Sequence, residues 1–145
     1  MTGLKVTMMS LKVAISGILL ALCGGLFAQS VIGMSKTDVE DLVKKQHREF
    51  RRDNTIVRQQ FNYLKYVNGL KTRTWIIYFN DEDICRSSKL VCDYSEYEDV
   101  VGELGGSYRK VGDCLWEYSL ATEETVRVEL TRQEWYFSVR ESRKE

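Results

Sequence analysis

The chain has no proline and a single histidine among its 145 residues. The absence of proline excludes a proline-rich linker. His47 would have to be the base of any nucleophile–histidine pair, and one histidine with scattered cysteines and acids lacks the paired spacing of a zinc site. Because Lys44, Lys45 and Arg48 flank His47, we expect it on the surface of a charged helix. The sequence therefore predicts no catalytic residue, no cofactor and no metal ligand.

The chain also lacks an apolar run of the roughly 20 residues that cross a bilayer as a helix. Its longest apolar run, Val13 to Phe27, has 15 residues and contains no charge. Lys5 and Lys12 precede this run without any acid, and the small-x-small sequence Ala28-Gln29-Ser30 follows it. This order is typical of a secretory signal peptide. We therefore predict that residues 1–30 direct export, to the periplasm or the outside, and are then removed.

Three details of the leader stay open. The mature chain would begin at Gln29 or Val31, and translation from Met9 instead of Met1 would give a shorter leader. Cys23 could carry a lipid anchor, although lipid attachment usually requires a small residue before the cysteine and Leu22 is not small. Otherwise Cys23 is one more small apolar residue of the leader. Export places the other cysteines where disulfides form.

The remaining residues, 31–145, are enough for one domain with a modest core. They carry 19 basic and 21 acidic residues, a net charge of −2, which gives no electrostatic reason to expect nucleic acid. Ten basic residues lie between Lys36 and Arg73, and eight acidic residues lie between Asp81 and Glu103. We expect these segments to face one another or to solvate their own surfaces, with docking to a partner as the alternative.

Two amphipathic helices are predicted. The first begins after Ser35, an N-cap with Asp38 as its capping-box partner. Its apolar face is formed by Val39, Leu42, Val43, Gln46 and Phe50. The second begins at Ser95 and ends at Gly105-Gly106.

Alternating apolar and polar residues predict the strands. They cover residues 61–67, 70–79, 84–92, 108–111, 114–118, 125–131 and 135–140. Asn68-Gly69 is a strong hairpin signal, and short turns elsewhere favour antiparallel pairing. The expected fold class is α+β, a two-layer domain with helices on one face of an antiparallel sheet, in the order αβββ-αβββ(β).

Three cysteines remain after the leader: Cys85, Cys92 and Cys114. If residues 84–92 form one strand, Cys85 and Cys92 lie about 23 Å apart on opposite faces, too far for a direct bond. We therefore predict a Cys92–Cys114 disulfide, with Cys85 as the alternative partner of Cys114. A turn at residues 86–89 would instead allow a Cys85–Cys92 bond, and the third thiol could link two chains.

Most aromatic residues fit core or cross-strand positions. Tyr78 and Tyr136 instead fall on the outer face of their predicted strands. An exposed aromatic sheet face is a reasonable surface for binding a protein or a glycan.

Residues 32–39, Ile-Gly-Met-Ser-Lys-Thr-Asp-Val, resemble the Gly-Met-Ser/Thr helix start of the SmpA/OmlA (BamE-like) envelope proteins. A helix followed by antiparallel strands is also their order, and the β-lactamase-inhibitor-protein fold is similar. The resemblance assigns no site residue, but it implies a small exported binding module. We therefore expect a non-enzymatic module that binds an unknown protein or envelope component through its sheet. A structural homodimer subunit of the cell envelope and a small extracytoplasmic enzyme are the alternatives.

Overall fold

The computed structural model describes residues 29–55 and 60–145. The predicted signal peptide and Cys23 lie outside the described residues, apart from Gln29 and Ser30. No helix in the described part of the chain is both long and apolar enough to cross a membrane.

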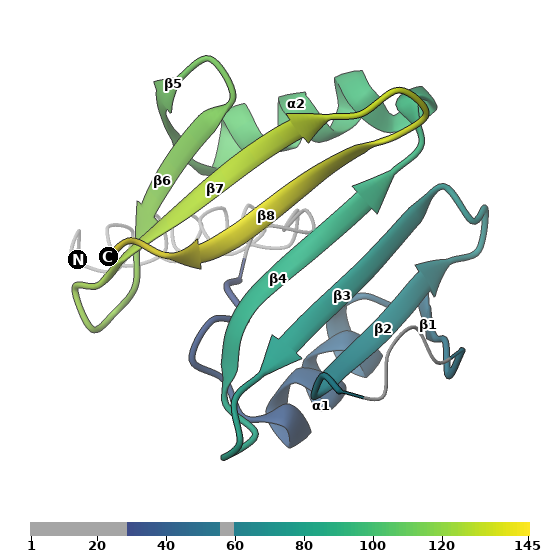
Figure 1. Cartoon of the computed structure of the whole chain (residues 1–145), viewed down its shortest axis with the longest axis vertical. Helices are drawn as coiled ribbons and strands as arrows, with labels where there is room; N and C mark the ends of the chain where they lie inside the picture. The colour runs from purple at the N-terminus through teal and green to yellow at the C-terminus, as the bar shows by residue number, and fades with distance from the viewer. Residues whose placement is uncertain (1–28, 56–59) are drawn as a thin grey trace, which may run out of the picture.

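Within these residues the chain forms one eight-stranded sheet and two α-helices (Figure 1). The elements are, in chain order, α1 (Lys36–Gln46), β1 (Phe50–Arg52), β2 (Tyr63–Asn68), β3 (Arg73–Phe79), β4 (Cys85–Cys92), the 3-10 turn η2 (Tyr94–Glu96), α2 (Tyr97–Ser107), β5 (Arg109–Gly112), β6 (Leu115–Ser119), β7 (Thr125–Arg132) and β8 (Phe137–Arg143). The strand order is β1-β2-β3-β4-β8-β7-β6-β5, and all neighbours pair antiparallel. Each helix thus leads into a four-stranded meander, and the two meanders join where β4 pairs with β8.

The predicted fold class, a two-layer α+β domain in the order αβββ-αβββ(β), is wrong. The protein is mostly an eight-stranded antiparallel sheet, and its two described helices have 11 residues each. A helix of this length extends over roughly 16 Å, whereas eight strands span roughly 34 Å. The helices therefore do not form a layer that matches the sheet. The antiparallel pairing, in contrast, is confirmed.

The strand that the sequence prediction missed is β1. Phe50 falls at helical spacing from the apolar face of α1, so the pattern extended the first helix through it. The helix in fact ends at Gln46, because His47 leaves the helical conformation with φ −126° and ψ 55°. Phe50 is nevertheless buried, because β1 brings its ring to 5.8 Å from that of Trp75, measured between centroids.

The start of α1 is confirmed, and both ends of α2 differ from the prediction. The Ser35 side chain accepts a hydrogen bond from the backbone N–H of Asp38 at 3.2 Å, as an N-cap does. The predicted cap Ser95 lies inside η2, where its N–H donates to the Asp93 side chain at 2.9 Å. The helix also continues through Gly105-Gly106 instead of ending there.

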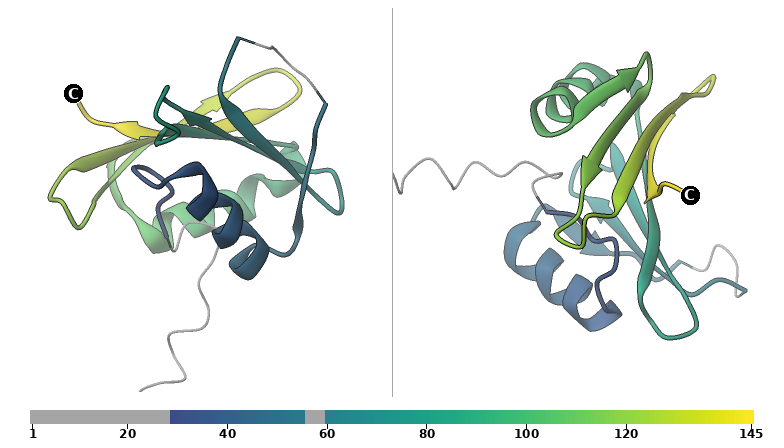
Figure 2. Two further views of the ribbon diagram at one scale, coloured as in Figure 1. Left: turned by 90° about the horizontal axis from the view of Figure 1, so that it is seen from below. Right: turned by 90° about the vertical axis from the view of Figure 1, so that its left-hand side faces the viewer.

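Both helices pack against the same face of the sheet (Figure 2). The largest fully buried side chains of that face are Leu64, Ile77, Val126, Val128, Phe137 and Val139. The helices add Val39, Leu42, Val43, Val100 and Leu104 to this core. The other face, which we call the open face, has no helix over it in the described part of the chain (Figure 2).

An ion-pair cluster ties α2 to the first meander. Arg73 on β3 lies 2.8 Å from a carboxylate oxygen of Glu96 and 3.2 Å from one of Glu103. All three side chains are at least two-thirds buried. The basic and acidic stretches of the sequence therefore face one another at this point.

The first described residues are built into the core. Ser30 Oγ and the Tyr118 hydroxyl share a hydrogen bond at 2.5 Å, and Val31 is only 1% exposed. Further along, the N–H of Gly33 donates to the carbonyl of Cys85 at 2.9 Å. This segment therefore joins the start of β4 before α1 begins.

The two adjacent isoleucines of β3 test the assignment of the sheet faces. Ile77 is fully buried in the core, whereas Ile76 is half-buried on the open face. We expect Ile77→Ala to lower the free energy of unfolding by about 2–5 kcal/mol, because it leaves a cavity. Ile76→Ala, the matched control, should lower it by about 1 kcal/mol or less. Denaturant unfolding measures both, and equal losses would contradict the assignment.

Candidate binding surface on the open face of the sheet

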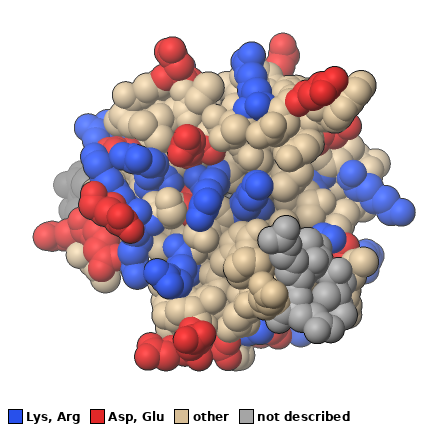
Figure 3. All heavy atoms as spheres, in the orientation of Figure 1, with Lys and Arg blue, Asp and Glu red and all other residues tan. Residues whose placement is uncertain are grey.

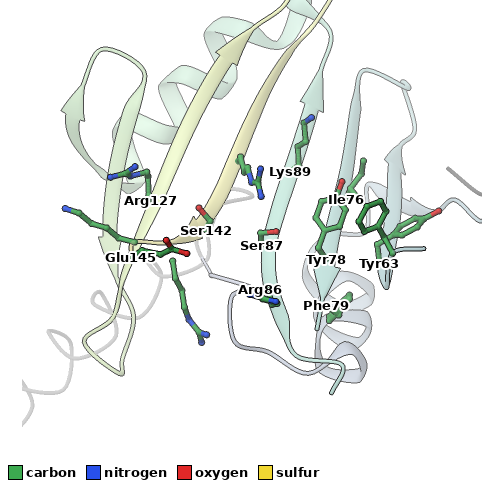
Figure 4. Close-up of a pocket in the computed structure, with 14 residues that line it drawn as sticks. Tyr63, Ile76, Tyr78, Phe79, Arg86, Ser87, Lys89, Arg127, Ser142 and Glu145 are labelled. Atoms are coloured by element: carbon green, nitrogen blue, oxygen red, sulfur yellow. The ribbon is translucent and has the colours of Figure 1, made fainter. Parts of the chain in front are cut away.

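Strand register arranges the side chains of the open face in rows that run across the sheet. One row contains, from β2 to β7, Tyr63, Tyr78, Ser87, Ser142 and Arg127. The next contains Lys65, Ile76, Lys89, Arg140 and Glu129. Members of a row face the same side because side chains alternate in direction along each strand. Most of these residues line a hollow of about 1300 Å³ (Figure 4).

The end of the hollow over β2 and β3 is aromatic. The rings of Tyr63 and Tyr78 lie 6.5 Å apart between centroids, and Figure 4 shows them near Ile76. Phe61, just before β2, lines the same hollow and is 52% exposed. Such side chains bind apolar groups, because the contact removes apolar surface from water.

The end of the hollow over β4, β8 and β7 is basic. It is lined by the cations Arg86, Lys89, Arg127 and Arg140, by Arg143 and Lys144, and by one acid, Glu145. Figure 3 shows Lys and Arg side chains from the left edge to the middle of the open face, with some acids among them. The ion pairs of the described residues involve other cations, namely His47, Arg52, Lys65, Arg73, Arg109, Arg143 and Lys144. Within the described part of the chain, Arg86, Lys89, Arg127 and Arg140 thus have no acidic partner within 4.0 Å.

The pair Lys89 and Arg140 is the feature of the open face that folding does not explain. Register places these residues directly opposite one another on β4 and β8. Like charges at directly opposed positions destabilise an antiparallel pair. Glu129 stands opposite Arg140 on its other side but forms no ion pair with it among the described residues. The sheet therefore carries two directly opposed cations that form no ion pair within the described part of the chain.

The structure separates the two tyrosines that the sequence placed on one binding face. Tyr78 lies in the row that lines the hollow. Tyr136 lies in the turn between β7 and β8, beside Trp135, and these residues are 40% and 80% exposed. The cations of the hollow, which the sequence reasoning did not single out, share the surface with Tyr78 instead. The alternation of residues along β4, β7 and β8 could have indicated that these cations lie on the outer face of the sheet.

The three described cysteines are free thiols, so the predicted Cys92–Cys114 disulfide is not formed in the structure. A register shift at Phe79, opposite the start of β4, puts Cys85 in the core together with Cys92. Burial raises the pKa of both thiols to about 12, so neither forms the reactive thiolate at neutral pH. Cys114 is half-buried in the turn between β5 and β6.

A polar cluster lies on the helical side of the sheet. The buried carboxyl of Glu141 on β8 lies 2.9 Å from the Tyr108 hydroxyl and 3.4 Å from the Ser88 hydroxyl, both of which donate to it. Burial raises the pKa of Glu141 to about 6. The cavity at this cluster has a volume of about 10 Å³, which is close to the minimum for one water molecule. The cluster can hold a proton, but it has no room for a substrate.

His47 is not on the surface, as the sequence predicted, but is 5% exposed. Its ring meets that of Trp75 edge-on, with centroids 5.4 Å apart. Nδ1 lies 3.8 Å from Glu49, and Nε2 has no hydrogen-bond partner among the described residues. Burial lowers the pKa of His47 below its ordinary value. The imidazole therefore packs as part of the core at the end of α1.

No protein-family model, curated protein or solved structure was found to match the chain. The resemblance of residues 32–39 to the BamE-like proteins therefore stays a prediction. In the described part of the chain, no group of three or more His, Cys, Asp or Glu side chains is arranged to hold a metal. We therefore place the candidate functional site on the open face.

Thiol reactivity tests the environments of the three described cysteines. In the folded protein we expect a maleimide to modify Cys114 quickly and the two core thiols only after denaturation, because those stay protonated and covered. Cys114→Ser should remove one fast-reacting thiol from the count by mass spectrometry. Cys92→Ser should leave the number of fast-reacting thiols unchanged, and a decrease in that variant would contradict the buried position of Cys92.

The buried carboxyl of Glu141 predicts a specific dependence of stability on pH. Its pKa in the folded protein, about 6, lies above its ordinary value of 4.5. The folded state therefore binds the proton more tightly, and stability falls as the pH rises from about 4.5 to about 6. We compare the free energy of unfolding of Glu141→Gln with that of the parent protein. Between pH 4 and pH 7.5, the difference should change by about 2 kcal/mol in favour of the variant. Because both proteins retain His47, its titration cancels in the difference, and a difference that does not vary with pH would contradict the prediction.

Proposed function

We propose that this protein is a non-enzymatic binding module that acts after export and binds a protein partner through the open face of its sheet. The observation that carries the proposal is the hollow of about 1300 Å³ on a face that no helix covers in the described residues. It combines the exposed Phe61 and the half-buried Tyr63 and Tyr78 with four cations that form no ion pair among the described residues. Surfaces that combine aromatic residues with arginine are enriched at protein interfaces.

The groups that could perform chemistry lie away from this hollow. Glu141 sits on the helical side of the sheet in a cavity of about 10 Å³, and His47 packs against Trp75 in the core. The residues that line the hollow include neither histidine nor cysteine. These positions support a binding role over a catalytic one.

Export is supported by the sequence of the leader alone. Its basic start, apolar run and small-x-small end are the features of a secretory signal peptide. A partner would then be an envelope or extracellular protein.

Site-specific photo-cross-linking tests the proposed surface. A benzoylphenylalanine replacing Tyr78 in the full chain, expressed in its native cells, should give a discrete protein adduct after irradiation, because this side chain lies within the hollow. The same photo-reactive residue replacing Lys45, an exposed position on α1 on the other side of the molecule, should not give that adduct. Equal adducts at both positions, or none at position 78, would contradict the proposal.

A further inference from the structure

Three of the cations that line the hollow without forming an ion pair lie on adjacent strands. Lys89 and Arg140 occupy directly opposed positions on the two central strands, and Arg127 lies one row away on β7. Arg127 faces Glu117 on the neighbouring strand β6, but that carboxylate already lies 2.9 Å from Lys144 and 3.4 Å from Arg109. The acids nearest in the sheet thus form no ion pair with Lys89, Arg127 or Arg140 in the described part of the chain, and Glu145 is the one acid that lines the hollow (Figure 4).

An anion placed between Lys89 and Arg140 would turn their repulsion into two attractions. A carboxylate has two oxygens and accepts several hydrogen bonds, so it can bridge an ammonium and a guanidinium on adjacent strands. Ser87 and Ser142, paired with one another in the next row, add hydroxyl donors beside this position. The chemistry of this end of the hollow is thus that of a site for carboxylate-type anions.

A uniform polyanion would fit the hollow poorly. Its other end is formed by Tyr63, Ile76 and Tyr78, which offer apolar surface instead of charge. Glu129 closes the row of Lys89 and would repel a continuous anionic chain. A ligand with an apolar group beside a short acidic stretch matches both ends.

Strand spacing gives the size of that ligand. From β2 to β7 the hollow crosses five strands, or roughly 19 Å at about 4.8 Å per strand interval. An extended peptide rises about 3.3 Å per residue, so roughly six residues cover this distance. The aromatic strand β3 and the basic strand β8 are two intervals apart, which places the first acid about three residues from the apolar side chain.

We propose that the partner docks through an extended acidic segment, whose carboxylates bind over Lys89, Arg140 and Arg127. A neighbouring aromatic or aliphatic side chain of the same segment packs against Tyr63 and Tyr78. This inference rests on the proposed function of the open face, and it adds the chemistry of the partner. The segment lies across the strands, on the face of the sheet, and does not pair with a sheet edge.

A designed peptide tests this chemistry directly. The probe carries two aromatic residues, a two-residue Gly-Ser spacer and three glutamates, and it is made in both chain directions with a fluorescent label. Fluorescence anisotropy with the full chain should show binding of at least one direction, about tenfold or more tighter than that of the same peptide with glutamines. Added salt should weaken the binding, because screening acts over about 10 Å at 0.1 M salt.

Charge reversal separates recognition from folding. Lys89→Glu combined with Arg140→Glu should abolish binding of the glutamate peptide and allow binding of the matching lysine peptide. The single variant Lys89→Glu places opposite charges at the paired positions, so it should fold at least as well as the parent while losing peptide affinity. The matched control, Lys44→Glu combined with Lys45→Glu on α1, changes the net charge equally and should bind as the parent does.

Three results would contradict the proposal that the partner docks through an acidic segment. The first is equal affinity for the glutamate and glutamine peptides. The second is no difference between the reversed variant and the control variant. The third is tighter binding of heparin, or of vesicles of equal parts phosphatidylglycerol and phosphatidylcholine, than of either glutamate peptide, because that would assign the surface to a polyanion or a lipid.

The cross-link at position 78 distinguishes this failure from failure of the proposed function. If both proposals hold, the adduct disappears in the Lys89→Glu, Arg140→Glu background and on addition of the glutamate peptide. An adduct that persists in both conditions would contradict docking through an acidic segment, but it would still support protein binding by the open face. Absence of any adduct in the otherwise unaltered protein overturns the proposed function itself.

Discussion

The antiparallel pairing of β4 with β8 is the interaction on which the rest of the structure depends. Six residue pairs join strands whose partners lie 45 to 55 residues apart in the chain. Each four-stranded meander pairs strands that follow one another in the chain, but only the pairing of β4 with β8 joins the two meanders into one sheet. Its formation requires closing a long loop, whose entropy must be offset by the core that the joined sheet buries. Every row across the open face passes through this junction.

Two electrostatically unfavourable arrangements of side chains lie at this junction. On its helical side Glu141 is buried beside Ser88, and on its open side Lys89 faces Arg140. A buried carboxyl and two directly opposed cations both work against stability. The helical-side group is satisfied by hydroxyl donors within the protein, whereas the open-side pair is left to solvent. That asymmetry is why the open face, and not the buried acid, is the better candidate for an interaction with another molecule.

Patterns between neighbouring residues were enough to predict most of the strands. Features that depend on contacts between distant residues could not be predicted from the sequence. Alternation along the chain and the Ser35 cap depend on neighbouring residues, and they placed α1 and seven strand regions near their observed positions. Phe50 fits a helical stripe and a short strand equally well, so β1 was missed. The charged neighbours of His47 indicated exposure, but packing against Trp75 is a tertiary contact that no local pattern carries. At the candidate site, the alternation of residues correctly placed Tyr78 on the outer face. That Lys89 lies opposite Arg140 could be seen only once the register of β4 against β8 was known.

The burial of Val31 has a consequence for how the chain is processed. A protease needs several residues of extended, accessible backbone around the bond it cuts. Ser30 is hydrogen-bonded to Tyr118, Val31 is 1% exposed, and Gly33 is bonded to the start of β4. Any enzyme that cuts beside Val31 therefore acts on the chain before this segment docks. For such an enzyme, cleavage would have to precede closure of the core, so slow cutting at this bond would compete with folding.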